Sequence, residues 1–298
     1  MTTEPSSGTT GFAALSPALQ ATILSVAAML LFSVVPPSVR LLSDTMSSWQ
    51  IVFIRAAFGV MGIGLYFVWT GLHKLKSRQM KIHIIRSTFN FVGMVMWFWA
   101  LAHIELAKGI AIHFTMPLFI VLLAVIFLKE RIGPWRITAM LAGFGGVLII
   151  LRPGMIETGL PELAILGSAA LYGGAVVYLK KVVADETPAA VTFYTNLFMA
   201  IGCIGPTVFL WAPITTADIL PVLGLGVCGL FAPFLVAIAL RKADASLIAA
   251  FDFLRLPFTA LFGFLLFGEV PDEFVWLGAV VIFGSTYFIA RREAMKQN

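Results

Sequence analysis

Long apolar stretches, separated by short polar links, constrain this chain more than any other feature of its sequence. A helix needs roughly 20 apolar residues to cross the hydrocarbon core of a membrane, and ten stretches of about that length follow one another. Charged residues make up only 12% of the 298 residues, whereas about 25% is usual in soluble domains. The sequence therefore predicts an all-α membrane protein with ten transmembrane helices. They are expected at residues 18–42, 49–70, 82–103, 107–128, 134–152, 161–180, 188–211, 218–240, 245–267 and 274–290.

The basic residues are distributed unevenly over the links, and this predicts how the helices are oriented. If the N-terminus is cytoplasmic, fifteen Lys and Arg residues lie on the cytoplasmic side, against three on the other side: Arg40, Lys108 and Arg152. Cytoplasmic links of membrane proteins carry such an excess. We therefore expect a multi-pass protein of the cell membrane with both termini in the cytoplasm. The net charge of +5 follows from this orientation and does not indicate nucleic-acid binding.

The chain also contains an internal repeat. Residues 99–150 align with residues 238–289 at an offset of 139 to 140, which places Pro117 on Pro257. Each copy holds five expected helices, an odd number, so the two copies would enter the membrane from opposite sides. Inverted repeats are typical of secondary transporters, whose substrate site lies near the middle of the membrane.

This repeat predicts the division of the chain. We expect a disordered cytoplasmic tail at 1–17, a first repeat at 18–152, a second repeat at 161–290 and a basic cytoplasmic tail at 291–298.

Two segments carry a resemblance to a known family. They are PLFIVLLAVIFLKERIGPWRITAMLAGFGGVLIILRPG in the first repeat and PFTALFGFLLFGEVPDEFVWLGAVVIFGSTYFIARRE in the second. In each segment a proline, a short polar stretch and a glycine-rich helix follow one another in this order. In this order they resemble the EamA-like branch of the drug/metabolite transporter superfamily. The resemblance implies ten helices, cytoplasmic termini, a central cavity and the export or import of small metabolites. The segment FDFLRLPF is similar to the subgroup of S-adenosylmethionine uptake carriers and solute carrier family 35G relatives, although Phe253 stands where a tyrosine is expected.

Asp252 and Arg255 are charged residues inside an expected membrane helix, where each charge costs a few kcal/mol. They are three residues apart, so a continuous helix would place them on one face. They either form a local ion pair that makes both charges tolerable, or they contact a charged substrate or carry a proton.

Two further polar positions fall inside the expected helices. His113 aligns with Asp252 at the offset of 139, and because histidine titrates near neutral pH, these two residues are the candidates for proton coupling. A packed histidine bonded to a carbonyl is the alternative for His113. Arg55 either attracts an anionic substrate group or extends toward the membrane surface.

Aromatic and amide side chains complete the predicted site. Trp97, Tyr172 and Phe251 are candidates for an apolar wall against a substrate ring. Asn90 and Asn196 are candidates for substrate contact, or for hydrogen bonds that join helices.

These residues together predict a secondary transporter that moves a small polar metabolite by alternating access. Both signs of charge favour a zwitterion such as S-adenosylmethionine or an amino acid; a riboflavin or organic-anion carrier is the alternative. A channel or an intramembrane enzyme is disfavoured, because the polar residues are too few for a continuous pore or a catalytic set. No phosphate-binding loop and no metal-ligand spacing occurs, so we expect no cofactor and no metal. The expected partners are the substrate, the lipid bilayer and protons as a coupling ion; the oligomeric state is left open.

Overall fold

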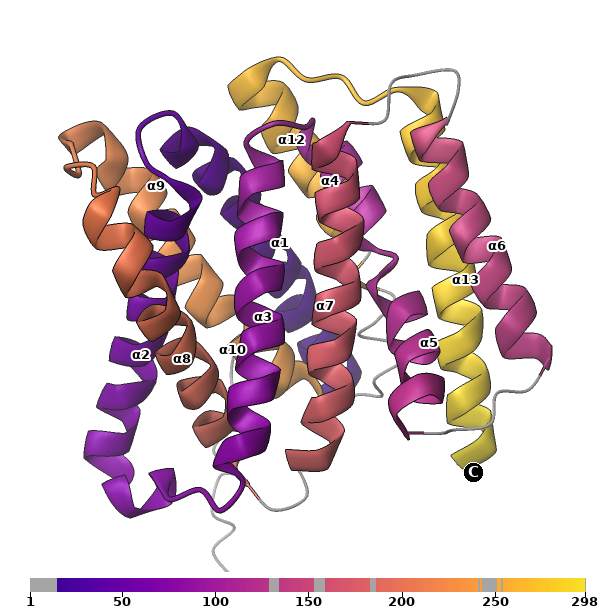
Figure 1. Cartoon of the computed structure of the whole chain (residues 1–298). Helices are drawn as coiled ribbons and strands as arrows, with labels where there is room; N and C mark the ends of the chain where they lie inside the picture. Colours follow the sequence, from indigo (N-terminus) through magenta and orange to yellow (C-terminus); the bar gives the residue numbers. More distant parts are fainter. Residues whose placement is uncertain are drawn as a thin grey trace, which may run out of the picture.

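The computed structural model describes residues 15–128, 134–152, 159–182, 186–240, 242, 251–252 and 254–297. Within these residues the secondary structure is helical throughout, which confirms the predicted all-α class. Most of the helices run side by side between the two ends of a bundle (Figure 1). Residues 1–14 of the expected tail, residues 243–250 and Phe253 lie outside the described part.

The first half of the chain forms six α-helices and one short 3-10 helix. They are α1 (Pro17–Ser43), α2 (Ser48–Thr70), the 3-10 helix η2 (Leu72–Leu75), α3 (Met80–Leu101), α4 (Leu106–His113), α5 (Met116–Leu128) and α6 (Pro134–Leu151).

The second half begins at residue 159 and contains a π-helical turn. Its helices are α7 (Leu160–Val182), α8 (Pro188–Phe209), the 3-10 helix η3 (Thr216–Asp218), α9 (Ile219–Leu223), the π-helix η4 (Gly224–Cys228), α10 (Gly229–Leu240), α12 (Arg255–Phe267) and α13 (Glu273–Gln297). Because α13 reaches Gln297, the helix continues through most of the expected basic tail.

Hydroxyl side chains fix where three of the helices begin. Ser16, Ser47 and Thr187 precede α1, α2 and α8, and each side chain accepts the backbone N–H three residues later, at 3.3, 3.4 and 3.3 Å. Such caps satisfy one of the free N–H groups of a helix start, where no helical partner exists. Helix α1 continues through Pro36 and Pro37 without ending there.

Seven helices are long and apolar enough to cross a membrane, and three shorter apolar helices accompany them among the described residues. The seven are Leu19–Ser43, Ser48–Thr70, Met80–Leu101, Leu106–Phe127, Leu160–Tyr178, Ala189–Phe209 and Thr216–Val236. The shorter helices are Ile137–Leu151, Arg255–Phe267 and Glu273–Ser285. Eight of these segments begin and end within four residues of the predicted bounds. The segment Arg255–Phe267 begins ten residues after the predicted start at 245, and Glu273–Ser285 ends five residues before the predicted end at 290. The structure therefore supports a multi-pass membrane protein, and the count of ten crossings stays a prediction.

Two of the predicted spans are not single continuous helices. The span expected at 107–128 breaks between α4 and α5, because Pro117 has no N–H to donate to the carbonyl of His113, four residues earlier. The span expected at 245–267 breaks before α12, where the N–H of Leu254 donates to the carbonyl of Phe251 in a turn, at 2.9 Å. Asp252 precedes this turn and Arg255 begins α12, and their side chains still meet three residues apart.

Contacts between helices join the two halves of the chain. Helix α3 packs against α7, α6 against α13, α2 against α8 and α1 against α10. Figure 1 shows the link between α12 and α13 at one end of the bundle and the C-terminus at the other. We refer to the end that holds this link, residues 268–272, as the α12–α13 end.

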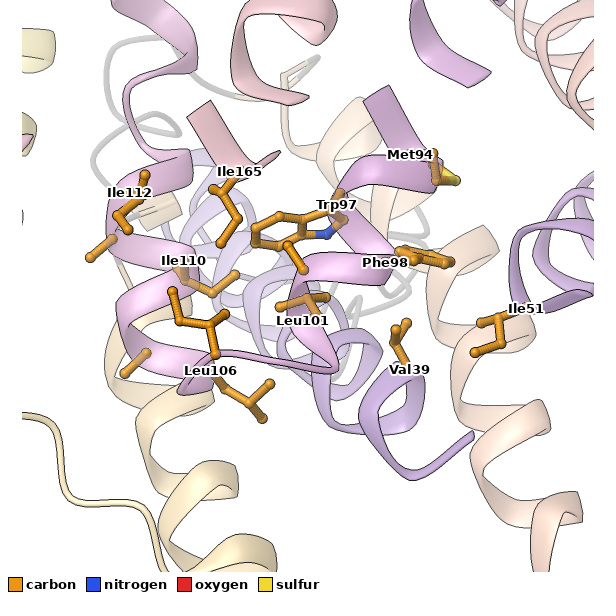
Figure 2. Close-up of a cluster of buried hydrophobic side chains, with 14 of the residues drawn as sticks. Val39, Ile51, Met94, Trp97, Phe98, Leu101, Leu106, Ile110, Ile112 and Ile165 are labelled. Carbon is orange, nitrogen blue, oxygen red and sulfur yellow. The ribbon is translucent and has the colours of Figure 1, made fainter. Parts of the chain in front are cut away.

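The main hydrophobic core lies toward the α12–α13 end. It contains residues from the last turns of α1 and α3, such as Val39 and Leu101, and from the first turns of α2 and α4, such as Ile51 and Leu106. Ile165 of α7 joins them (Figure 2). Close van der Waals packing of these side chains holds the helix ends of both halves together, because lipid chains are as apolar as the core and supply no hydrophobic driving force.

Candidate functional site

The rings of Trp97, His113 and Tyr172 meet at the end of α4, where the chain breaks before α5. His113 is the last residue of α4, and its ring lies 4.4 Å from the ring of Trp97, between centroids, at an angle of 41°. The ring of Tyr172 meets His113 edge-on, at 5.5 Å and 78°. Figure 2 shows Trp97 reaching from α3 toward Ile165 of α7. The structure thus brings together three residues predicted from two different halves of the chain.

The imidazole of His113 has an unused hydrogen-bonding atom. Its Nε2 is buried and has no hydrogen-bond partner among the described residues. Buried polar atoms of proteins are nearly always paired with protein or water. This atom is therefore available to a ligand or a water molecule, and the alternative of a histidine bonded to a carbonyl through this nitrogen is not observed.

Arg55 points into the protein and does not extend toward the membrane surface. Its Nη1 donates to the sulfur of Met94 at 3.6 Å, and a thioether is only a weak acceptor. Among the described carboxylates, none forms an ion pair with Arg55. Its charge interacts with Tyr172, and its Nε lies beside Gly229 of α10, where an added Cβ would approach to 3.4 Å. A guanidinium without a carboxylate partner is suited to bind an anionic group.

Asp252 and Arg255 form an ion pair, which is one of the two alternatives that the sequence left open for them. Arg255 Nη1 lies 3.5 Å from Asp252 Oδ1, and the side chains are 22% and 45% exposed. This distance exceeds the 2.7–2.9 Å that is usual for a strong charged hydrogen bond, so the carboxylate keeps capacity for another partner. Arg255 also lies over the ring of Phe32, at 4.9 Å from its centroid.

Helix α1 holds the start of α12 in place. The hydroxyl of Ser33 donates to the carbonyl of Met29, at 2.8 Å, and approaches the carbonyl of Arg255, at 3.3 Å. We define the central cluster as Arg55, Trp97, His113, Tyr172 and Arg255, with Asp252 at its edge.

Three other predicted site residues do not join the central cluster. Asn90 and Asn196 each donate to a carbonyl four residues earlier in their own helix, at 3.1 and 2.9 Å. The amide of Asn196 also fills the space beside Gly59 of α2, where an added Cβ would come within 2.4 Å of it. Phe251 is partly buried, and no described ring contact joins it to the cluster.

Sequence reasoning missed a set of ion pairs at the α12–α13 end. The three basic residues that were counted only for orientation each pair with an acidic residue of the second half: Arg40 with Glu269, Lys108 with Glu162 and Arg152 with Asp272. Glu105 lies near them, and burial together with the negative charge of Glu269 raises its pKa above the ordinary value. The isolated bases on the sparsely charged side were the signal that could have found these pairs.

A smaller polar group lies at the opposite end. The carboxylate of Glu186 accepts hydrogen bonds from Ser77 and pairs with His83. Burial acts to raise the pKa of Glu186, but these hydrogen bonds outweigh it and the pKa is lowered. Tyr194 stacks near His83, at 4.9 Å between ring centroids.

The described residues contain no group of three His, Cys, Asp or Glu side chains that could hold a metal ion.

Sequence comparison confirms the resemblance noted above. The profile of the EamA-like transporter family matches residues 19–152 and again residues 159–291. A riboflavin transporter of Vibrio cholerae serotype O1 is 31% identical over 84% of this chain and 85% of its own. A riboflavin transporter of Rhizobium johnstonii is 32% identical, over 81% and 82%. An S-adenosylmethionine uptake transporter of Rickettsia bellii is 29% identical, over 85% and 87%.

The fold also has a counterpart among solved structures. One crystal structure covers 92% of this chain and 98% of its own, with a TM-score of 0.63 and 18% sequence identity. At this identity the likeness concerns the arrangement of the helices alone.

Proposed function

Because the chain belongs to the EamA-like transporter family of small-molecule transporters, we propose that it carries a zwitterionic metabolite, such as S-adenosylmethionine or an amino acid, across the cell membrane. The observation that carries this proposal is the central cluster, which combines an arginine without a described carboxylate partner, a half-exposed carboxylate and a set of aromatic rings. Intramembrane ionisable residues of this kind mark substrate or ion pathways.

Each part of a zwitterion has a partner in this arrangement. The guanidinium of Arg55 receives the carboxylate, since its described partner is only the sulfur of Met94. Asp252 receives the cationic group, because its contact with Arg255 is long and its side chain is half exposed. The rings of Trp97 and Tyr172 stack against an apolar or ring-bearing part of the substrate.

Alternating access of two inverted halves is the proposed mode of movement. The family profile matches each half once, and both halves have a helix break at the aligned positions, after His113 and before Arg255. In transporters built from inverted repeats, broken helices near the middle of the membrane line the substrate site. The excess of basic residues on alternate links supports cytoplasmic termini.

Proton coupling through Asp252 and His113 is part of the proposal. Asp252 is half exposed, and Nε2 of His113 has no described partner, so each has capacity to accept a proton when the substrate leaves. Asp252 also pairs with Arg255, whose charge would hold the carboxylate when the substrate is absent.

Riboflavin or an organic anion is the second candidate substrate. The three rings of His113, Trp97 and Tyr172 suit a flat aromatic ligand, and two relatives at 31% and 32% identity are named riboflavin transporters. For this substrate Asp252 serves only to balance Arg255.

Thermal unfolding of the purified protein tests the two candidates against each other. A ligand present at 100 times its dissociation constant adds about 2.7 kcal/mol to the stability of the folded state. We expect stabilisation by S-adenosylmethionine or an amino acid that is lost in the Asp252→Asn variant. Stabilisation by riboflavin or a dicarboxylate that survives this substitution would reject the zwitterion. An Asp44→Asn variant, which changes an exposed residue at the end of α1, is the matched control.

A further inference from the structure

Three ion pairs tie the two halves of the chain together at the α12–α13 end. Their bases, Arg40, Lys108 and Arg152, all come from the first half, and their acids all come from the second half. Each ion pair joins a different helix of the first half to the second half. Arg40 of α1 reaches the link after α12, Lys108 of α4 reaches α7, and Arg152 at the end of α6 reaches the link before α13.

Additional contacts hold the first pair in place. Nη1 of Arg40 donates to the carbonyl of Ile104, at 2.8 Å, and its guanidinium lies over the ring of Phe267, at 5.0 Å. Glu269 accepts the backbone N–H of Leu106, the first residue of α4, at 2.9 Å. The link between α3 and α4 is thereby fixed to the link between α12 and α13.

The other two pairs are supported in the same way. Nζ of Lys108 donates to Glu162 at 2.7 Å, and Glu162 also accepts the N–H of Gly159, at 3.0 Å. Arg152 pairs with Asp272 and lies over the ring of Phe274, at 4.3 Å. Asp272 accepts the N–H of Val275 in the first turn of α13, at 2.9 Å.

The apolar core lies toward the same end as these ion pairs. Among the described residues, Leu101, Leu106, Ile150 and Val275 are all buried within a few residues of the paired charges. Charges and apolar packing therefore close the same end of the bundle. Any opening between the halves at this end must break both.

We infer that the three ion pairs form the outer gate of the transporter, and that this structure has the gate closed. The inference rests on the proposed transport function and on the orientation that places Arg40, Lys108 and Arg152 outside. The bases of the pairs are 20% to 28% exposed, so water can replace the partner of each when the halves separate. Partly exposed ion pairs contribute little net stability and can break and form again, as a gate requires.

Labelling of a reporter cysteine tests the gate without any substrate. Ser168 is buried on α7 between Glu162 and Tyr172, so a Ser168→Cys side chain lies between the gate and the central cluster. Cys203 and Cys228 are first replaced by alanine, because both are free thiols. Intact cells are then treated with a membrane-impermeant maleimide, and the rate of labelling from outside is measured.

We expect slow labelling while the gate is intact. In the Lys108→Gln variant the rate rises up to about fivefold, the population shift that corresponds to the upper end of the contribution of a partly exposed ion pair. Exchanging the charges with Lys108→Glu and Glu162→Lys together restores slow labelling. The Lys242→Gln variant is the matched control, since Lys242 pairs with Gln20 away from the gate and its labelling rate stays unchanged.

Two outcomes would overturn the inference. One is a labelling rate from outside that is the same in Lys108→Gln as with the gate intact. The other is faster labelling in Lys108→Gln that the charge exchange does not reverse, which would indicate general loosening of the fold. Neither labelling rate depends on the identity of the substrate. The gate can therefore be rejected while the proposed zwitterion transport stands, and the transport can be rejected while the gate stands.

Discussion

At the scale of single residues, the most informative group is the guanidinium of Arg55. A buried cation normally has a carboxylate partner, yet the described contact of Arg55 is a sulfur atom of Met94. The sequence indicated this residue, since it is one of two bases inside apolar stretches. Whether it turned inward could not be predicted, because that depends on α3 and α10 lying beside it.

Replacement of Arg55 by glutamine should weaken the binding of carboxylate-bearing ligands. A hydrogen bond to a charged group contributes about 1.5–3 kcal/mol, so we expect the dissociation constant to rise roughly 10- to 150-fold. Equilibrium binding to the purified protein measures this. The Arg78→Gln variant changes an exposed arginine and should bind as the parent protein does; an equal loss in both variants would contradict the prediction.

Asp252 and His113 give a second prediction at this scale. In proteoliposomes, the Asp252→Asn variant should lose uptake driven by an imposed pH gradient, because the amide cannot carry a proton. Exchange of substrate without a gradient should fall as well, because Asp252 also receives the cationic group of the substrate, but it should recover at high substrate concentration, whereas gradient-driven uptake should not. Unchanged gradient-driven uptake would exclude Asp252 from coupling, and the same measurement on His113→Gln then decides whether the histidine alone couples.

At the scale of helices, the contact between α6 and α13 depends on close approach of the two backbones. A Cβ added to Gly146 would lie 2.8 Å from the carbonyl oxygen of Gly278, and one added to Gly278 would lie 2.6 Å from that of Gly146. Gly145 is its neighbour in the same helix, and an added Cβ there would meet nothing within 4 Å. The two adjacent glycines therefore have different roles.

Alanine in place of Gly146 and alanine in place of Gly145 should affect the stability of the protein differently. We expect Gly146→Ala to lower the free energy of unfolding by about 1–3 kcal/mol, because a backbone must shift. Gly145→Ala should leave it unchanged or raise it by up to about 1 kcal/mol, through the better helix propensity of alanine. Thermal unfolding in detergent compares them, and similar melting temperatures for both would show that the helices do not touch at Gly146.

The sequence predicted the helices better than their interruptions. Apolar length places most of the described spans to within a few residues, because the thickness of a membrane fixes it. The span that contains Pro117 breaks, but α1 continues through Pro36 and Pro37, so proline alone does not decide. Asp252 and Arg255 were expected on one helix face, and they form an ion pair across the turn at Leu254, three residues apart.

At the scale of the whole molecule, packing is concentrated at the α12–α13 end. The described core and three inter-half ion pairs gather there. Pairings of this kind join residues 54 to 229 positions apart in the chain, and a single sequence gives no direct signal of which base meets which acid. Orientation, by contrast, is predicted by counting charges link by link.

The sorting of charges in the gate has a consequence for how the halves recognise each other. A first half that met a second copy of itself would bring together Arg40, Lys108 and Arg152, and like charges facing one another are unfavourable. If the chain is cut between residues 153 and 158 and the fragments are produced separately, neither fragment should self-associate through this face. Produced together, they should assemble as a mixed pair and regain ligand binding. The three ion pairs therefore favour the association of a first half with a second half over the association of two identical halves.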